Sequence, residues 1–74
     1  MPEIPLGSID RIIRKNGGSK VKIESSQVLR RILEDIGSEI VLKARDLAKN
    51  RNQQIITKDD IELAFSLYKK SFEK

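Results

Sequence analysis

Apolar residues recur at helical spacing in three segments of the chain, and the first of these segments is short. Its apolar positions are Leu6, Ile9, Ile12 and Ile13. Spacings of three and four residues are typical of one face of a helix, so the segment predicts a helix over about 6–16. Either Pro5 or Ser8 can begin that helix, and Asn16 followed by Gly17 is a pattern that ends one.

The middle segment predicts one long helix over about 24–50 with a broad apolar face. That face comprises Leu29, Ile32, Leu33, Ile36, Ile40, Ala44 and Leu47, with Val28, Val41 and Ala48 at its margins. An ordinary surface helix has an apolar stripe about 100° wide, so this helix must be covered on more than one side. Gly37 costs ~1 kcal/mol relative to Ala in mid-helix, which indicates the close approach of another helix. Leu42 falls among polar positions, and nothing in the sequence explains it.

Charged residues occupy the opposite side of the long helix and the start of the third segment. The opposite-charge pairs at i,i+4 spacing on the long helix are Arg31–Asp35 and Glu39–Lys43. In the third segment Thr57 is a good N-cap, and Asp59 and Asp60 suit the first turn of a helix over about 58–70. The apolar positions of that helix are Ile61, Ala64, Phe65 and Tyr68. Strand signals are confined to a few residues, so the sequence predicts an all-α class and one domain over 1–74.

The length of the chain argues for a second protein chain as partner. The chain has 74 residues and neither His nor Cys, which excludes a disulfide and the usual zinc sites, and we expect no metal or cofactor. Chains below about 70–80 residues usually need such a staple or an oligomer, so without a staple this chain must rely on idealised packing or on a partner subunit. The predicted middle helix would be ~40 Å long, whereas a globule of this size is ~30 Å across. We therefore predict an obligate dimer.

The positive charge of the chain lies in its first part. The net charge is +4, and residues 1–31 carry seven basic and three acidic residues, whereas 32–74 carry eight of each. A basic excess on one part of a small domain indicates a polyanionic partner such as nucleic acid, although a solvated basic surface is an alternative. The sequence contains neither a run of 18 apolar residues nor a secretory leader, so we expect an intracellular protein.

The ordered set of residues along these segments resembles an archaeal histone. The matching runs are Ile9-Asp10-Arg11-Ile12-Ile13-Arg14, Ile32-Leu33-Glu34-Asp35-Ile36-Gly37, Leu47-Ala48-Lys49 and Ile56-Thr57-Lys58-Asp59-Asp60-Ile61-Glu62-Leu63-Ala64, with Gly17, Val21, Leu29, Ile40 and Ala44 between them. The match runs without gaps from about Ile9 to Ala64. It implies the histone fold, in which two chains cross their long helices in a handshake near Gly37. The implied dimer interface comprises Leu29, Ile32, Leu33, Ile36, Gly37, Ile40, Ala44 and Leu47.

The resemblance also implies binding of double-stranded DNA without base readout. The implied DNA-binding residues are Arg11, Arg14, Lys15, Lys20 and Lys22 from the first helix and loop, and Gln54, Ile55, Thr57 and Lys58 from the second loop and the helix after it. Among them, Arg11 matches the arginine that enters the minor groove. By this resemblance the protein bends or wraps DNA and compacts the chromosome in the cytoplasmic nucleoid.

Several positions depart from the pattern of archaeal histones. Gln53, Gln54 and Ile55 stand where an Arg-Lys-Thr run is usual, which predicts that Asp60 lacks its arginine partner. Lys22 replaces the serine that caps the long helix, with Ser25 or Glu24 as substitutes. The residues that would join one dimer to the next are Leu47, Asn50, Asp60 and Leu63, and Asn50 replaces a common histidine there. Stacks of dimers are therefore expected to be weakened but still possible through Leu47 and Leu63.

Two other functions are consistent with the sequence. One is an interaction module, in which the chain pairs with a histone-fold paralogue as one half of a heterodimeric transcription factor and binds DNA weakly. The other is an enzyme, for which the only candidates are the carboxylate pairs Glu34-Asp35 and Asp59-Asp60. These pairs lie in surface and capping contexts, so we expect no enzymatic activity.

Overall fold

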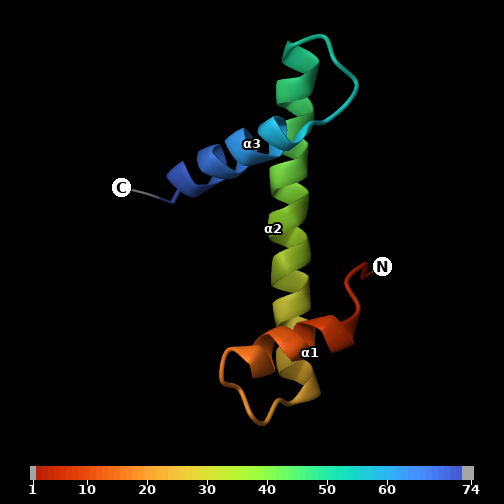
Figure 1. Ribbon diagram of the computed structural model, residues 1–74, viewed down its shortest axis with the longest axis vertical. Coiled ribbons are helices and arrows are strands. Elements are labelled where there is room, and N and C mark those ends of the chain that lie inside the picture. The colour runs from red at the N-terminus through yellow and green to blue at the C-terminus, as the bar shows by residue number, and fades with distance from the viewer. Residues whose placement is uncertain (1, 73–74) are drawn as a thin grey trace. The chain divides into compact units, whose positions relative to one another are not determined.

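Three helices make up the computed structural model, which describes residues 2–72 (Figure 1). They are α1 (Leu6–Lys15), α2 (Ile23–Asn50) and α3 (Lys58–Lys70), and the described residues contain no strand. The predicted all-α class and the short–long–short order of the helices are confirmed. The chain forms two compact units, Met1–Ile36 and Gly37–Lys74, each with one short helix and one part of α2.

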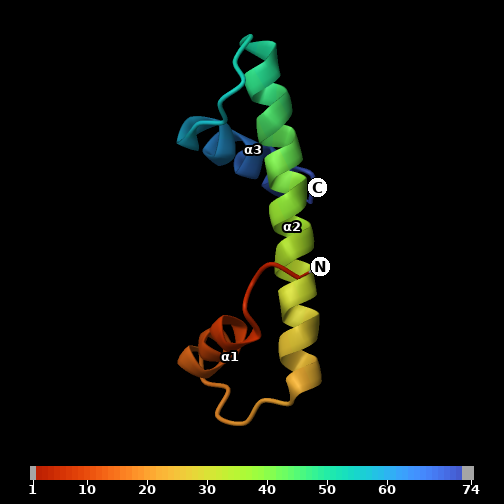
Figure 2. The same cartoon turned by 90° about the vertical axis from the view of Figure 1, so that its right-hand side faces the viewer.

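In the first unit α1 lies beside the N-terminal part of α2 (Figures 1 and 2). Ile9 is fully buried there and is the largest such side chain among residues 2–72. Of the two predicted starts for α1, Pro5 occupies the N-cap without a side-chain hydrogen bond, and Ser8 lies inside the helix. The helix ends at Asn16, as predicted, and Gly17 follows with a φ of +102°, a conformation that favours glycine.

The segment before α1 is tethered to α2 by Glu34. The Glu34 carboxylate accepts hydrogen bonds from the backbone N–H groups of Ile4, at 2.8 Å, and of Glu3. These bonds favour the ionised form, so they hold the pKa of Glu34 below its usual value, with a smaller contribution from the positive charge of Arg30. Glu34 therefore has a structural role in this unit.

The start of α2 corrects one prediction. The helix begins at Ile23, so Glu24 and Ser25 lie in its first turn and neither is the residue before it. The Lys22 carbonyl accepts the first bonds of the helix, from the N–H groups of Ser25 at 3.0 Å and Ser26 at 3.4 Å. Lys22 thus occupies the N-cap position, and Glu24 instead supplies the negative charge that the N-terminus of a helix favours.

The second unit packs α3 against the C-terminal part of α2 through small side chains. Ala44, Ala48 and Ala64 are buried, which lets the two helices approach closely. Thr57 caps α3 as predicted: its hydroxyl accepts a hydrogen bond from the Asp60 N–H, and the Asp60 side chain accepts one from the Thr57 N–H. This reciprocal pair is a capping box, which satisfies two backbone donors at once.

Large apolar side chains remain exposed in both units. They are Ile12, Ile23, Val28, Ile32, Val41, Leu42, Ile55, Ile56, Ile61, Leu63, Phe65, Leu67 and Phe72. The buried apolar residues of the described chain are Ile9 and three alanines, which is a small core. Apart from its chain neighbours and the nearby backbone of α2, a Cβ placed on Gly37 would meet no atom of residues 2–72 within 4 Å, so this part of the chain does not supply the closely approaching helix that the glycine predicts.

The two ion pairs predicted on the long helix are not formed. The ion pairs within residues 2–72 are Asp10–Arg14, Arg45–Asp46 and Arg51–Asp60. The predicted partners Arg31, Asp35, Glu39 and Lys43 are all exposed. Exposed pairs gain little in water and lose side-chain entropy, which explains why favourable spacing alone does not form them.

Candidate nucleic-acid interface

The basic residues of α1 and the loop after it form the first candidate surface. Arg11, Arg14, Lys15, Lys20 and Lys22 are all exposed. They follow one another along the end of α1 and the segment that leads to α2, so their charges gather in the first unit. Such a cluster is the electrostatic pattern that attracts phosphate.

Arg14 and Arg11 differ in how their guanidinium groups are engaged. Arg14 Nε lies 2.9 Å from Asp10 Oδ2, and its Nη1 donates to the Ser19 carbonyl at 3.1 Å. Arg14 therefore joins α1 to the loop and has part of its charge neutralised. Arg11 makes one long bond, 3.4 Å from Nη2 to Ser8 Oγ, within the described residues. Arg11 consequently keeps most of its donors for another molecule.

The second loop, between α2 and α3, is exposed but carries little charge. Gln54, Ile55, Thr57 and Lys58 are all exposed, and the Ile55 side chain is 71% accessible. The hydroxyl of Thr57 is already engaged in the capping box, and it lies 3.1 Å from Asp60 Oδ2. What this loop offers to a ligand is its amide side chains, its backbone and the ammonium group of Lys58.

The prediction that Asp60 lacks an arginine partner is wrong. Arg51 Nη2 lies 2.6 Å from Asp60 Oδ2, and the Asp60 side chain is nearly buried. The cause is a shift of the arginine along the chain: Arg51 follows α2 directly, two positions before the expected site at Gln53. Only the turn that ends α2 brings Arg51 to the start of α3, so a comparison by position could not reveal the pair.

The pKa of Asp60 is lowered by its hydrogen bonds. The largest cause is the Thr57 N–H, which donates to Asp60 Oδ2 at 2.9 Å. The Thr57 hydroxyl and the Arg51 guanidinium lower the pKa further, while burial acts in the opposite sense. Asp60 is consequently an ionised structural residue, and its chemistry is not that of a proton donor.

The residues predicted to join one dimer to the next lie together in the second unit. Leu47, Asn50, Asp60 and Leu63 line one pocket of about 510 Å³. The other residues that line it are Arg51, Thr57 and Asp59. The pocket thus combines two leucines with an amide and an ion pair, a mixture suited to contact with another protein surface.

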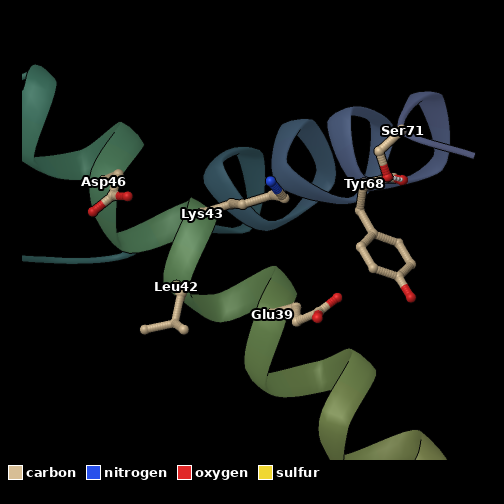
Figure 3. Close-up of a pocket in the computed structure, with 6 residues that line it drawn as sticks. All are labelled: Glu39, Leu42, Lys43, Asp46, Tyr68 and Ser71. Atoms are coloured by element: carbon tan, nitrogen blue, oxygen red, sulfur yellow. Dashed lines mark hydrogen bonds between the residues drawn. The ribbon is translucent and has the colours of Figure 1, made fainter.

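The second unit has another pocket, and one of the residues that line it is Leu42. Leu42 lines it together with Glu39, Lys43, Asp46, Tyr68 and Ser71 (Figure 3). In the close-up, Glu39 and Lys43 extend on the side of Tyr68, whereas Leu42 extends away from it. Leu42 is half exposed, so it belongs to the surface and not to the core of the second unit. Nothing in this pocket pairs a nucleophile with a base.

Residues 2–72 contain no cluster of three or more acidic side chains that could hold a metal ion. Nor does any helix within that range have the length and the apolar character needed to cross a membrane.

Known proteins share this arrangement of residues. The model of the family described as "Histone-like transcription factor (CBF/NF-Y) and archaeal histone" matches residues 2–65. The chain is 33% identical over 64 residues to one of the subunits of the archaeal histone HAN1 of Thermococcus zilligii, a match that covers 86% of this chain and 96% of that protein. It is 31% identical over 64 residues to "Probable archaeal histone 3" of Methanocaldococcus jannaschii, with the same coverage. The chain belongs to the family of histone-like transcription factors and archaeal histones.

Proposed function

We propose that this protein is a histone that binds double-stranded DNA as a homodimer, without sequence specificity, and bends it. The observation that carries the proposal is the exposed basic cluster on α1 and its loop, in a chain of the archaeal histone family. We further propose that the protein has no enzymatic activity and that it resides on the chromosome.

Phosphate neutralisation is the physical basis of the proposed binding. Arg11, Lys15, Lys20 and Lys22 form no ion pair within residues 2–72, so their charges remain for the DNA backbone. A dimer doubles this surface. We assign Arg11 to the minor groove, because a guanidinium gains from the focused negative potential of a narrowed groove.

The exposed apolar side chains support the proposed dimer. Val28 and Ile32 in the first unit and Val41 in the second are close to half accessible, although all three lie on the predicted apolar face of α2. Burying apolar surface stabilises a protein by about 25 cal/mol per Å². This stabilisation is absent while the three side chains stay in water. A second copy of the chain offers the same face and would bury both.

A heterodimer is the second candidate. The HAN1 relative is named as one subunit of a histone, and the family also includes histone-like transcription factors. Gln53 and Gln54 leave the second loop without the cations expected of an archaeal histone. In that case the protein would pair with a histone-fold paralogue and bind DNA weakly by itself.

Light scattering of the purified protein, combined with a gel shift on random-sequence duplex, separates these candidates. The proposal predicts a dimer in the absence of any other protein and a shifted complex at low salt. A monomer, or a dimer that leaves the duplex unshifted at low salt, would contradict it. A dimer that shifts DNA only after a paralogue is added would support the heterodimer.

A further inference from the structure

The loop that follows α1 is fixed at its start by close contact with the helix. The Gly17 N–H donates to the Arg14 carbonyl at 3.1 Å, and the Gly18 N–H donates to the Ile13 carbonyl at 3.0 Å. A Cβ placed on Gly18 would lie 2.6 Å from Ile13 Cγ2, so the backbone of the loop lies directly against α1 at this point. The first two residues of the loop therefore have a defined position.

The next three residues lack such backbone bonds. Within residues 2–72, Ser19, Lys20 and Val21 form no hydrogen bond from backbone to backbone. The bond of 3.1 Å from Arg14 Nη1 to the Ser19 carbonyl is the one hydrogen bond that reaches the backbone of these three residues in that part of the chain. The backbone is held again at Lys22, whose carbonyl accepts the first bonds of α2. Arg14 thus supplies the polar contact that fixes the middle of the loop.

Asp10 holds the same guanidinium group from the side of the helix. Its Oδ2 lies 2.9 Å from Arg14 Nε, one turn earlier on α1. An acidic residue four positions before a basic one is the favourable orientation for an ion pair on a helix. Because the five donors of a guanidinium form a rigid planar fork, Arg14 can bind a carboxylate and a carbonyl at the same time. The pair as a whole is neutral, so it attracts phosphate less than a free guanidinium would.

We propose that Arg14 is a positioning residue of the first loop and does not itself bind phosphate. Asp10 orients its guanidinium, the guanidinium holds the Ser19 carbonyl, and the fixed backbone presents Lys20 and Lys22 to the DNA. This role also explains why an acidic residue lies among the cations of α1, where a free carboxylate would repel DNA. The part of this inference that concerns DNA rests on the function proposed above.

Backbone order parameters measured by NMR test the positioning role without DNA. In the wild type we expect the Lys20 and Val21 amides to have values near ~0.8, close to those of rigid backbone. In the double variant Asp10→Asn with Arg14→Gln, which keeps the net charge, these values should fall towards ~0.6.

A second double variant serves as the matched control for the order parameters. Arg45→Gln with Asp46→Asn removes an exposed ion pair of 3.6 Å from the second unit and should leave the first loop unchanged. Equal order parameters for Lys20 and Val21 in the wild type and in Asp10→Asn with Arg14→Gln would overturn the proposal.

The salt dependence of DNA affinity tests whether Arg14 contacts phosphate. We expect Asp10→Asn with Arg14→Gln to bind random-sequence duplex about twofold to fivefold more weakly than the control double variant, on the scale of one exposed ion pair. The slope of log affinity against log salt should stay that of the wild type. A slope smaller by ~1.8 per dimer would show two lost phosphate contacts and overturn the positioning role.

Arg14→Lys separates the shape of the side chain from its charge. A lysine keeps the positive charge but has no planar fork to join Asp10 to the Ser19 carbonyl, so we expect the loop to loosen and DNA affinity to fall about twofold to fivefold. Wild-type affinity and loop order in Arg14→Lys would contradict the proposal. If the wild type fails to bind DNA, the proposed function fails, while the order parameters still decide whether Arg14 orders the loop.

Discussion

At the scale of a single residue, the Asp60 carboxylate binds groups from both ends of the second loop. It belongs to the capping box of α3, and it pairs with an arginine from the other end of the second loop. Because these partners favour the ionised form, Asp60 stabilises the folded state more when it is charged than when it is neutral. Its neighbour Asp59 has no bond of this kind within residues 2–72, so two adjacent aspartates differ in role.

Acid should therefore weaken the contribution of Asp60. Its pKa in the folded state lies below the usual value of 3.8, so its stabilising contribution is complete above that value and is lost as the pH falls through the folded pKa. We expect the difference in unfolding free energy between wild type and Asp60→Asn to be constant above about pH 5 and to shrink below about pH 4. Urea unfolding at fixed protein concentration measures it. A difference that grows on acidification would contradict this assignment.

At the scale of the element, α1 and α3 differ in how their N-termini are capped. α3 starts with a side-chain cap at Thr57, whereas α1 starts at Pro5 with none. The short α3 packs against α2 largely through buried Ala64, so its start must be held by local bonds. The capping box at the start of α3 thus compensates for the small apolar contact between α3 and α2.

Removal of the cap should destabilise the protein measurably. Thr57→Ala deletes the acceptor for the Asp60 N–H and should cost ~1 kcal/mol of unfolding free energy. Ser8→Ala is the matched control, since Ser8 lies inside α1 and, within residues 2–72, its hydroxyl makes only the 3.4 Å bond with Arg11. We expect a cost below ~0.5 kcal/mol for the control, as for other surface substitutions. Equal costs in urea unfolding would show that the capping box contributes nothing of its own.

Sequence periodicity predicted the helices well and the polar contacts poorly. The apolar spacing predicted helices over about 6–16, 24–50 and 58–70, and their bounds in the structure differ by at most one residue. Side-chain partners depend on turns that no periodicity describes, which is why the sequence predicts no arginine partner for Asp60, whereas Arg51 provides one. The capping box was only half anticipated: Thr57 was predicted as a cap, but not the return bond to Asp60.

The whole molecule has too little core for the apolar surface that it carries. The buried apolar side chains of residues 2–72 are Ile9 and three alanines, while much of the apolar face of α2 remains partly or largely exposed. One copy of the chain alone would be only marginally stable, because the burial of apolar surface is the main favourable term in folding. The second copy of the chain in the proposed homodimer would cover this surface.

A charge on the dimer face should abolish both the dimer and the fold. Ile40→Asp places a carboxylate where the proposed partner would bury it without a counter-charge, which is prohibitive. Leu42→Asp is the matched control, because Leu42 lies two positions away on the same helix and is half exposed outside that face. Circular dichroism and light scattering should show an unfolded chain in the first case and a helical dimer in the second. A helical, soluble monomer of Ile40→Asp would contradict the account.

The salt dependence of binding to random-sequence DNA tests the central claim most directly. The cations of α1 and its loop number ten per dimer (Arg11, Arg14, Lys15, Lys20 and Lys22 from each chain), and we expect roughly half to engage phosphate. Log affinity should then fall linearly with log salt, with a slope of about −4 to −5, and Arg11→Ala should weaken binding most. A slope near zero, or full affinity in Arg11→Ala with binding abolished by substitutions on the polar side of α2, would place the DNA elsewhere and contradict the account.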